Sequence, residues 1–594
     1  MNNIDEKFKD ASPEQTVARI LEILAENGLH ASERWAESGV SDCFSVHVTI
    51  DGTECGTYGK GITRPLARAS GYAELMERLQ NGFLYLKPLK RPDRRLLTQD
   101  ELFSESGPFF ARLAEKLTEK EGWHFTAERL IRIAAELEPG DRLDCTPYYS
   151  VTEDRQIPIP QRFLIDLCGS NGLSAGNSPA EAMVQGFSEI QERYCQYQFL
   201  FRHLTPPDVP EDYLAQFSVA SRIIRSIRAA GYDVVVKDCS LGEGYPVVCT
   251  AVIDRKTHQY HVHLGANPVF EIALERSLTE IFQGRNLSAL AIDRGFSTGD
   301  RPDSETYFVS FGQGHSIFPP EFFLDTPTYP FVPFPDRSGM TNPELLGYIR
   351  EFLRAHSLEL LVRNESYLGF NAWRLYVPGR TEVLTRDFVG KTPKVVLRRD
   401  TRNVWRNLLA ADRADCQQYL EYFRRCPKPK QIRLQFTRIT NVGLKLSRDD
   451  DTFFAYLTAA YAAWKCEDHA TCLENLTIAL PYFGGSDQNK AYFEALQCWL
   501  QLEQAGYEPD AIRQILLRFY DVQQTALLLT MIQAGRNPLE FSLPVCSGDC
   551  ERCRLKDRCL MPARENLVEV VNRGAAKFDA AQAMADLHTL FAGL

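Results

Sequence analysis

The pattern of hydrophobic and polar positions changes near residue 410. Before that point, short runs of β-branched and aromatic residues, such as 44–50 (FSVHVTI) and 246–253 (PVVCTAVI), stand between stretches with apolar residues at helical spacing. After about residue 412 the strand patterns fade, and Ala, Leu and aromatic residues recur at helical spacing. The pattern predicts a mixed domain over residues 1–410 and an all-helical domain over residues 411–594.

The mixed domain is expected to be α+β. Its strands and helices alternate too irregularly for a doubly wound parallel sheet. Neither a G-x-G-x-x-G segment nor a P-loop lysine signature occurs in the sequence. Both common nucleotide-binding folds are therefore disfavoured.

The helical domain contains one segment that resembles a tetratricopeptide hairpin. In residues 455–480, Cys472, Leu476 and Ala479 of the second helix are spaced to face the first. A looser second pair follows at residues 490–520, and an ordinary helical bundle is the alternative. Either arrangement predicts a docking or supporting domain.

Composition narrows the class of protein. The chain has 594 residues, which is longer than a domain with a single hydrophobic core usually is, so at least two domains are expected. Its 44% hydrophobic and 24% charged residues are typical of a globular protein. A net charge of -11 offers no positive field to a phosphate backbone, so we expect no direct nucleic-acid partner. Residues 1–15 lack the pattern of a signal peptide, and no run of about 18 apolar residues follows. We therefore expect a cytoplasmic protein without a membrane segment.

The first segment with candidate chemistry is 59–82, in which a Gly-Lys-Gly turn leads into a helix. Ser70, Glu74 and Glu77 follow at i, i+4 and i+7 and share one helical face, with Arg78 beside them. Taken alone, this pattern is typical of a solvated helix face.

A second segment, 170–194, repeats the arrangement. A Gly-rich turn opens a helix on which Gln185, Glu189 and Glu192 have the same spacing, and Arg193 follows. Two E-x-x-E-R segments in the same kind of context are poorly explained by chance.

A third helix, 271–285, places Arg276, Glu280 and Gln283 on one stripe. Carboxylates brought together repel one another unless a cation lies among them, and Mg²⁺ prefers such oxygen ligands together with phosphates. Arginines would orient phosphate oxygens, and turns at helix starts would add backbone N–H donors. The three helices predict a Mg²⁺-nucleotide site without a P-loop.

These motifs closely resemble those of the YcaO family of ATP-dependent enzymes. The family pattern S-x-x-x-E-x-x-E-R, followed by S-x-G-x-x-x-x-E-A and E-x-x-E-R, corresponds here to Ser70, Glu74, Glu77, Arg78, Ser174, Gly176, Glu181, Glu189, Glu192 and Arg193. The resemblance covers roughly residues 1–400. The segments SNGLSAGN and LGANPVFEIALERSLTEIFQGR are similar to the stand-alone branch that carries a tetratricopeptide-like C-terminal domain.

The resemblance implies a set of site residues. The Mg²⁺ ligands would be Glu74, Glu77, Glu189, Glu192 and Glu280. The nucleotide would be contacted by Lys9, Thr16, Ser70, Glu74, Ser174, Asn177, Gln185, Glu189, Arg276 and Glu280. The catalytic residues would be Glu77, Glu192 and Arg193.

The resemblance also implies a function. Family members use ATP to phosphorylate an amide oxygen of a peptide while a nucleophile attacks the amide carbon, which gives an azoline, amidine or thioamide. In the similar branch, the family protein assists the radical-SAM enzyme RimO in β-methylthiolating a small-subunit ribosomal protein, and a homodimer is expected. A non-catalytic ATP-binding adaptor for a radical-SAM partner is the main alternative, and a carboxylate-rich phosphohydrolase is a weaker one.

The chain has sixteen cysteines, of which twelve are scattered and expected to be reduced thiols. The other four, Cys546, Cys550, Cys553 and Cys559, form a C-x3-C-x2-C-x5-C array. Such spacing predicts a bound metal, either a [4Fe–4S] cluster or Zn²⁺. The alternative is a loop with incidental thiols.

Overall fold

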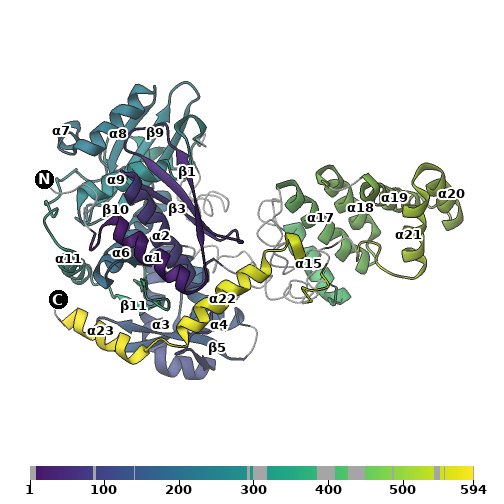
Figure 1. Ribbon diagram of the computed structural model, residues 1–594, viewed down its shortest axis with the longest axis horizontal. Coiled ribbons are helices and arrows are strands. Elements are labelled where there is room, and N and C mark those ends of the chain that lie inside the picture. Colours follow the sequence, from purple (N-terminus) through teal and green to yellow (C-terminus); the bar gives the residue numbers. More distant parts are fainter. Residues whose placement is uncertain are drawn as a thin grey trace. The chain divides into compact units, whose positions relative to one another are not determined.

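The computed structural model describes residues 9–84, 89–138, 141–290, 295–298, 317–383, 409–425, 448–484, 487–540, 543, 549–553 and 556–592. The chain divides into two compact units, one of residues 1–391 with 565–594 and the other of residues 392–564 (Figure 1). The first unit mixes helices and strands, and the second is helical. The predicted α+β class with a helical C-terminal region is confirmed.

The described strands of the first unit form three antiparallel sheets. Their strand orders are β1-β2-β3, β10-β9-β8 and β4-β5-β11-β12-β7, with β6 paired to β5. The bounds are β1 Ala31–Glu37, β2 Phe44–Ile50, β3 Gly56–Gly61, β4 Arg95–Leu97, β5 Leu143–Ser150, β6 Arg155–Pro160, β7 Leu173–Gly176, β8 Asp233–Asp238, β9 Val247–Asp254, β10 Gln259–Ala266, β11 Leu361–Asn364 and β12 Asn371–Tyr376.

Helices cover these sheets, and three of them carry the predicted glutamates. Helix α2 packs on β2 and β3, α6 on β7 and β12, and α9 on β10 and β9. The bounds are α1 Pro13–Glu26, α2 Arg64–Asn81, α3 Gln99–Glu121, α4 Ala127–Glu136, α5 Gln161–Cys168, α6 Pro179–Arg202, α7 Glu211–Leu214, α8 Ser218–Ala229, α9 Phe270–Ile281, α11 Asn342–Ala355, α22 Met561–Ala575 and α23 Ala580–Ala592, with short 3-10 turns at Leu287–Ala289 and Pro320–Phe323.

Local sequence fixes the ends of the two helices with E-x-x-E-R motifs. Thr63 caps the start of α2 by accepting a hydrogen bond from the Leu66 amide, and Gly82 ends the helix at φ 81°. Ser178 caps α6 in the same way from the Glu181 amide. The caps set where each helix begins, and therefore which residues face the sheet.

The last two helices differ from the predicted domain boundaries. Leu567 and Val571 of α22 are buried in the core that α1, α2 and β2 share. Leu587 and Phe591 of α23, yellow in Figure 1, join another core of the first unit. Residues 565–594 therefore belong with the first unit, whereas the sequence pattern assigned them to the helical domain.

The second unit is a stack of helices around one core. Its helices are α15 Arg413–Arg425, α17 Arg448–Lys465, α18 His469–Ala479, α19 Asp487–Gln504, α20 Pro509–Phe519 and α21 Val522–Gln533, with 3-10 turns at Leu480–Tyr482 and Lys556–Arg558. Cys472, Leu476 and Ala479 are buried in that core, which α17 and α19 also line. The tetratricopeptide assignment stays a prediction. Throughout the described ranges, no helix is both long and apolar enough to cross a membrane.

Candidate functional site

Helix α2 lies against strand β3 at a distance that only glycine allows. A Cβ on Gly59 would lie 2.0 Å from the Ala67 carbonyl oxygen and 2.4 Å from the Gly71 nitrogen. The Thr57 hydroxyl donates a hydrogen bond of 2.9 Å to the Gly71 carbonyl. This close approach fixes the position of β3, and of Lys60 within it, relative to α2.

Helix α6 approaches strand β7 in the same manner. A Cβ on Gly186 would lie 2.8 Å from the Ser174 hydroxyl oxygen, and one on Gly176 would lie 2.8 Å from the Ala182 nitrogen. Ser174 is fully buried, and its hydroxyl oxygen has no hydrogen-bond partner among the described residues.

Helix α9 is joined to α6 by a side-chain hydrogen bond. Arg276 Nη1 donates to Gln185 Oε1 over 2.6 Å. The Nε of Arg276 is buried and has no hydrogen-bond partner in the described part of the chain. Two of the predicted nucleotide contacts, Gln185 and Arg276, are therefore hydrogen-bonded to each other, and the Arg276 Nε–H remains available as a donor.

The predicted carboxylates of α2, α6 and α9 lie around Lys60 of β3, and we call Glu74, Glu77, Glu189, Glu192 and Glu280 the glutamate site. Glu77 is 8% exposed and Glu192 is 7% exposed. Burial raises the pKa of Glu77 to about 8, with Glu189 and Glu74 adding to the rise and Arg78 and Lys60 opposing it. Burial also raises the pKa of Glu192. The surroundings of Glu77 and Glu192 therefore disfavour the ionised form of these two carboxyl groups.

Cationic side chains lie among these carboxylates. Lys60 forms an ion pair with Glu280, and Arg78 Nε lies 3.2 Å from Glu77 Oε1. Burial and the nearby Arg276 lower the pKa of Lys60 to about 8, while Glu74, Glu192 and Glu189 act to raise it.

A matching pair forms on α6, where Arg193 Nε lies 3.9 Å from Glu192 Oε1. Over the described residues, no three Asp, Glu, His or Cys side chains already converge as a metal site. The present arrangement therefore balances charge by ion pairs.

The chemistry of the site suits Mg²⁺ and phosphate. Its acidic ligands all offer oxygen, which Mg²⁺ prefers. Glu77 Oε1 is buried without a hydrogen bond, although Arg78 lies near it. Orphaned buried polar atoms are uncommon in folded proteins, and two of the predicted nucleotide contacts have one, at Ser174 Oγ and Arg276 Nε. The residues fit a metal–nucleotide group.

A second group of predicted residues meets at the start of α6. Lys9 Nζ lies 3.1 Å from Glu181 Oε1, and the Asp10 amide donates to Glu181 Oε2 over 2.9 Å. Asn177 donates to the same carboxylate, and Thr16 donates to Asn177 Oδ1 over 2.9 Å. Burial acts to raise the pKa of Glu181, but these donors hold it below its usual value.

Both groups follow one face of α6. Glu181, Gln185, Glu189 and Glu192 recur at three- and four-residue steps, which corresponds to about 16 Å along the helix axis. The face thus connects the Lys9 group to the glutamate site. Ser70 lies partly buried on α2, one turn before Glu74.

Three residues of this region were not among the predicted site residues. Lys60, Arg78 and Glu181 lie in segments that the sequence singled out, yet none received a role. The Gly-Lys-Gly segment, which the sequence predicted as a turn and the structure places in strand β3, was the available signal for Lys60. Glycine on both sides of a lysine indicates close packing of the backbone. The roles of the individual predicted residues stay predictions.

The cysteine array gains no support from the structure. Cys546 lies outside the described residues, Cys550 is exposed, and Cys553 and Cys559 are partly exposed. No group of three metal-binding side chains forms within the described residues there. Metal binding by this array stays a prediction.

Comparison with solved structures gives overall fold likenesses only. A "Heterocyclase in complex with substrate and Cofactor" is 21% identical with a TM-score of 0.44, covering 63% of this chain and 52% of that one. "The structure of YcaO from Methanopyrus kandleri bound with AMPPCP and Mg2+" is 19% identical with a TM-score of 0.42, covering 66% and 98%.

Sequence comparison gives closer relatives. An uncharacterized protein of Haemophilus influenzae is 28% identical over 393 residues, which is 64% of this chain and 66% of the relative. The Escherichia coli protein named ribosomal protein S12 methylthiotransferase accessory factor YcaO is 29% identical over 406 residues, or 63% of this chain and 66% of the relative. The chain thus matches just under two thirds of the length of these relatives.

A family model covers the part of the chain that carries the glutamate site. The model described as YcaO cyclodehydratase, ATP- and Mg²⁺-binding, matches residues 58–381, more than half of the chain. The match includes α2, α6 and α9 entirely. The chain belongs to the YcaO family.

Proposed function

We propose that this chain binds Mg²⁺ and ATP at the glutamate site and uses the nucleotide to activate an amide of a protein or peptide. Its setting would be similar to that of the Escherichia coli relative, which is named as an accessory factor of a ribosomal protein S12 methylthiotransferase. The same role would make a RimO-type radical-SAM enzyme its partner.

One observation carries the proposal. Five glutamates from three helices lie around Lys60, two of them (Glu77 and Glu192) are buried, and burial raises the pKa of Glu77 to about 8. A purely structural cluster would be expected to replace such carboxylates by neutral groups. A bound divalent cation would offset the repulsion among these carboxylates, which explains why they are kept together.

Each residue has a proposed role. The five carboxylates of the glutamate site bind the metal, while Arg193 and Arg276 orient phosphate oxygens. Lys9, Thr16 and Asn177 hold the other end of the nucleotide through the hydrogen-bonded group around Glu181. When bound, ATP supplies the phosphoryl group that activates the amide oxygen.

Calorimetric titration of Mg²⁺-ATP into the protein tests the nucleotide site. The variant Glu192→Gln keeps the shape of a side chain that is 7% exposed and removes its charge. We expect at least about a tenfold weaker affinity, equivalent to about 1.4 kcal/mol. The matched control is Glu115→Gln, which changes an exposed glutamate on α3 and should leave the affinity unchanged.

Either of two results would contradict the proposal. The first is no saturable binding by the intact, folded protein. The second is an equal affinity of Glu192→Gln and Glu115→Gln, since that would place the nucleotide elsewhere.

A non-catalytic adaptor is the second candidate. It is favoured by the name of the relative, an accessory factor, and by the separate helical unit of residues 392–564. The adaptor predicts tight nucleotide binding with no hydrolysis when a radical-SAM partner is added. If the chain is an enzyme, phosphate should be released from ATP only when that partner is present. A thioamide or azoline formed in the peptide backbone would show that the same ATP-dependent activation leads to that product instead.

The proposal extends to the rest of the chain. The helical unit would dock the partner, and the array Cys546, Cys550, Cys553 and Cys559 would hold a [4Fe–4S] cluster or Zn²⁺. Metal analysis of the purified protein, with and without Cys559→Ser, would show whether iron or zinc is lost together with the thiol. A cytoplasmic homodimer is the expected assembly.

A further inference from the structure

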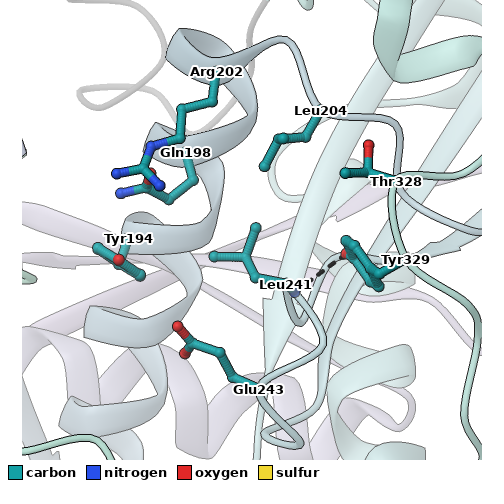
Figure 2. Close-up of a pocket in the computed structure, with 8 residues that line it drawn as sticks. All are labelled: Tyr194, Gln198, Arg202, Leu204, Leu241, Glu243, Thr328 and Tyr329. Atoms are coloured by element: carbon teal, nitrogen blue, oxygen red, sulfur yellow. Dashed lines mark hydrogen bonds between the residues drawn. The ribbon is translucent and has the colours of Figure 1, made fainter.

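A cavity of about 360 Å³ lies beside the C-terminal half of α6. Figure 2 shows Tyr194, Gln198 and Arg202 of α6 along one side, Tyr329 on the other, and Leu241 and Glu243 of the β8–β9 loop between them. The cavity is at the small end of the range of ligand pockets.

The cavity is separate from the glutamate site. Tyr194, Gln198 and Arg202 are spaced i, i+4 and i+8 and share one face of α6. At about 100° per residue, that face is centred about 150° around the helix from the face of Glu189 and Glu192. A molecule in the cavity would therefore contact α6 on nearly the opposite side.

The cavity carries an uncompensated positive charge. Glu243 is paired with Arg380 at 2.7 and 3.1 Å and accepts from Gln191 at 3.0 Å, so its own charge is balanced. Arg202 is exposed, and within the described residues no hydrogen bond or ion pair engages it. Burial raises the pKa of the Tyr194 hydroxyl, and Arg202 is close enough to oppose that rise.

A hydrogen-bond acceptor is also uncommitted. Gln198 is 2% exposed, and its Oε1 has no donor among the described residues. By contrast, the Tyr329 hydroxyl accepts from the Leu241 amide at 3.2 Å and donates to the Asp238 carbonyl at 2.8 Å. A buried amide oxygen without a partner indicates a missing donor.

We propose that this cavity binds a carboxylate-bearing peptide segment, with Arg202 pairing the carboxylate and the Gln198 amide pairing a peptide group. One arginine matches a single negative charge and forms two parallel hydrogen bonds to it. The side-chain amide matches a peptide group because both offer one acceptor and N–H donors. The apolar faces of Tyr194, Leu241 and Tyr329 would cover the peptide stem.

The inference stands apart from the proposed function, because the cavity needs neither Mg²⁺ nor ATP. Gln191 precedes Glu192, however, so the bound peptide would lie next to the helical turn that carries the glutamate site.

Three capped tripeptides test the proposal by calorimetry in the absence of nucleotide and metal. Acetyl-Ala-Glu-Ala-amide offers a side-chain carboxylate, acetyl-Ala-Ala-Ala offers a C-terminal carboxylate, and acetyl-Ala-Gln-Ala-amide offers neither. We expect saturable binding of at least one of the two carboxylate peptides, at least about tenfold tighter than the glutamine peptide. The arm that binds identifies the source of the carboxylate.

Variants locate the binding. Arg202→Gln should weaken the carboxylate peptide at least about tenfold, to the level of the glutamine peptide. Gln198→Met should weaken all three peptides while leaving the preference for the carboxylate. The control Arg132→Gln, which changes an exposed arginine on α4, should alter neither. Thermal unfolding of each variant verifies that it is folded.

Three results would overturn the inference. The intact protein could bind none of the peptides, Arg202→Gln could bind like Arg132→Gln, or inorganic phosphate could compete as well as the best peptide. The last result would make the cavity a simple anion site. Mg²⁺-ATP binding would survive each of them, so the two proposals fail separately.

Discussion

Replacing Lys60 by methionine removes the positive charge that β3 places among the carboxylates of α2, α6 and α9. Methionine keeps much of the length and the apolar stem of lysine. The five glutamates of the glutamate site, together with Lys60, Arg78, Arg193 and Arg276, carry a formal net charge of -1 when all are ionised. The substitution makes that charge -2, so repulsion among the glutamates should increase.

The magnitude follows from the ion pair. Lys60 and Glu280 are each 19% exposed, and breaking a buried pair costs about 3–5 kcal/mol. Because both side chains retain some contact with water and three arginines remain, we expect a loss of about 2–3 kcal/mol in the free energy of unfolding of the first unit. For a unit of this size the melting temperature should fall by roughly 2–6 °C.

Scanning calorimetry with and without Mg²⁺ is the assay. Mg²⁺ should raise the melting temperature of Lys60→Met more than that of the original protein, because the variant has the more negative site and no ammonium to displace. The control Lys116→Met changes a lysine that is 38% exposed and should shift neither value. The reasoning is refuted if Lys60→Met has the same melting temperature as Lys116→Met, or if Mg²⁺ raises the melting temperatures of Lys60→Met and the original protein equally.

Two further changes test the packing and the electrostatics of the first unit. Gly59→Ala should cost at least about 3 kcal/mol, because its Cβ would meet the Ala67 carbonyl oxygen at 2.0 Å, whereas Gly339→Ala enters open space and should be neutral in thermal unfolding. Asp238 has its pKa raised from 3.8 to about 6 by burial, so its ionisation lowers the stability of the original protein as the pH rises through that range. The variant Asp238→Asn should therefore gain up to about 3 kcal/mol over the original protein above pH 6, and little below pH 4, as measured by urea unfolding; an equal difference at both pH values would contradict the burial argument.

The sequence was most informative where function depends on helical spacing. Glu74 and Glu77, and likewise Glu189 and Glu192, could be assigned to helix faces because residues three and four apart project together. Glycines at 59 and 186 let both helices approach their strands closely, which sets where these faces lie. One E-x-x-E-R segment alone is typical of a solvated helix face, but its repetition indicated that the two helices contribute to one site.

Other parts depend on contacts between segments far apart in the chain. Lys60 sits in a short strand without helical periodicity, and its burial among carboxylates requires three helices to be in place. The cavity beside α6 combines that helix with a loop near residue 241 and a segment near residue 329. No local pattern predicts that such segments meet.

The helical region shows a similar limit. The amphipathic pattern of α22 and α23 indicates that each helix buries one face, but it does not say which core receives that face. Leu567 and Leu587 lie in two different cores of the first unit, although the chain reaches them only after residues 392–564.

The return of α22 and α23 to the first unit has a consequence for synthesis. The cores around α1 and α6 cannot be completed until residues 565–594 have left the ribosome, whereas residues 392–564 are available earlier. At about 5–20 residues per second, the intervening segment delays completion by roughly 10–35 s. During that interval α1 and α2 expose apolar surface, and the helical unit can finish folding before the unit that precedes it in the sequence.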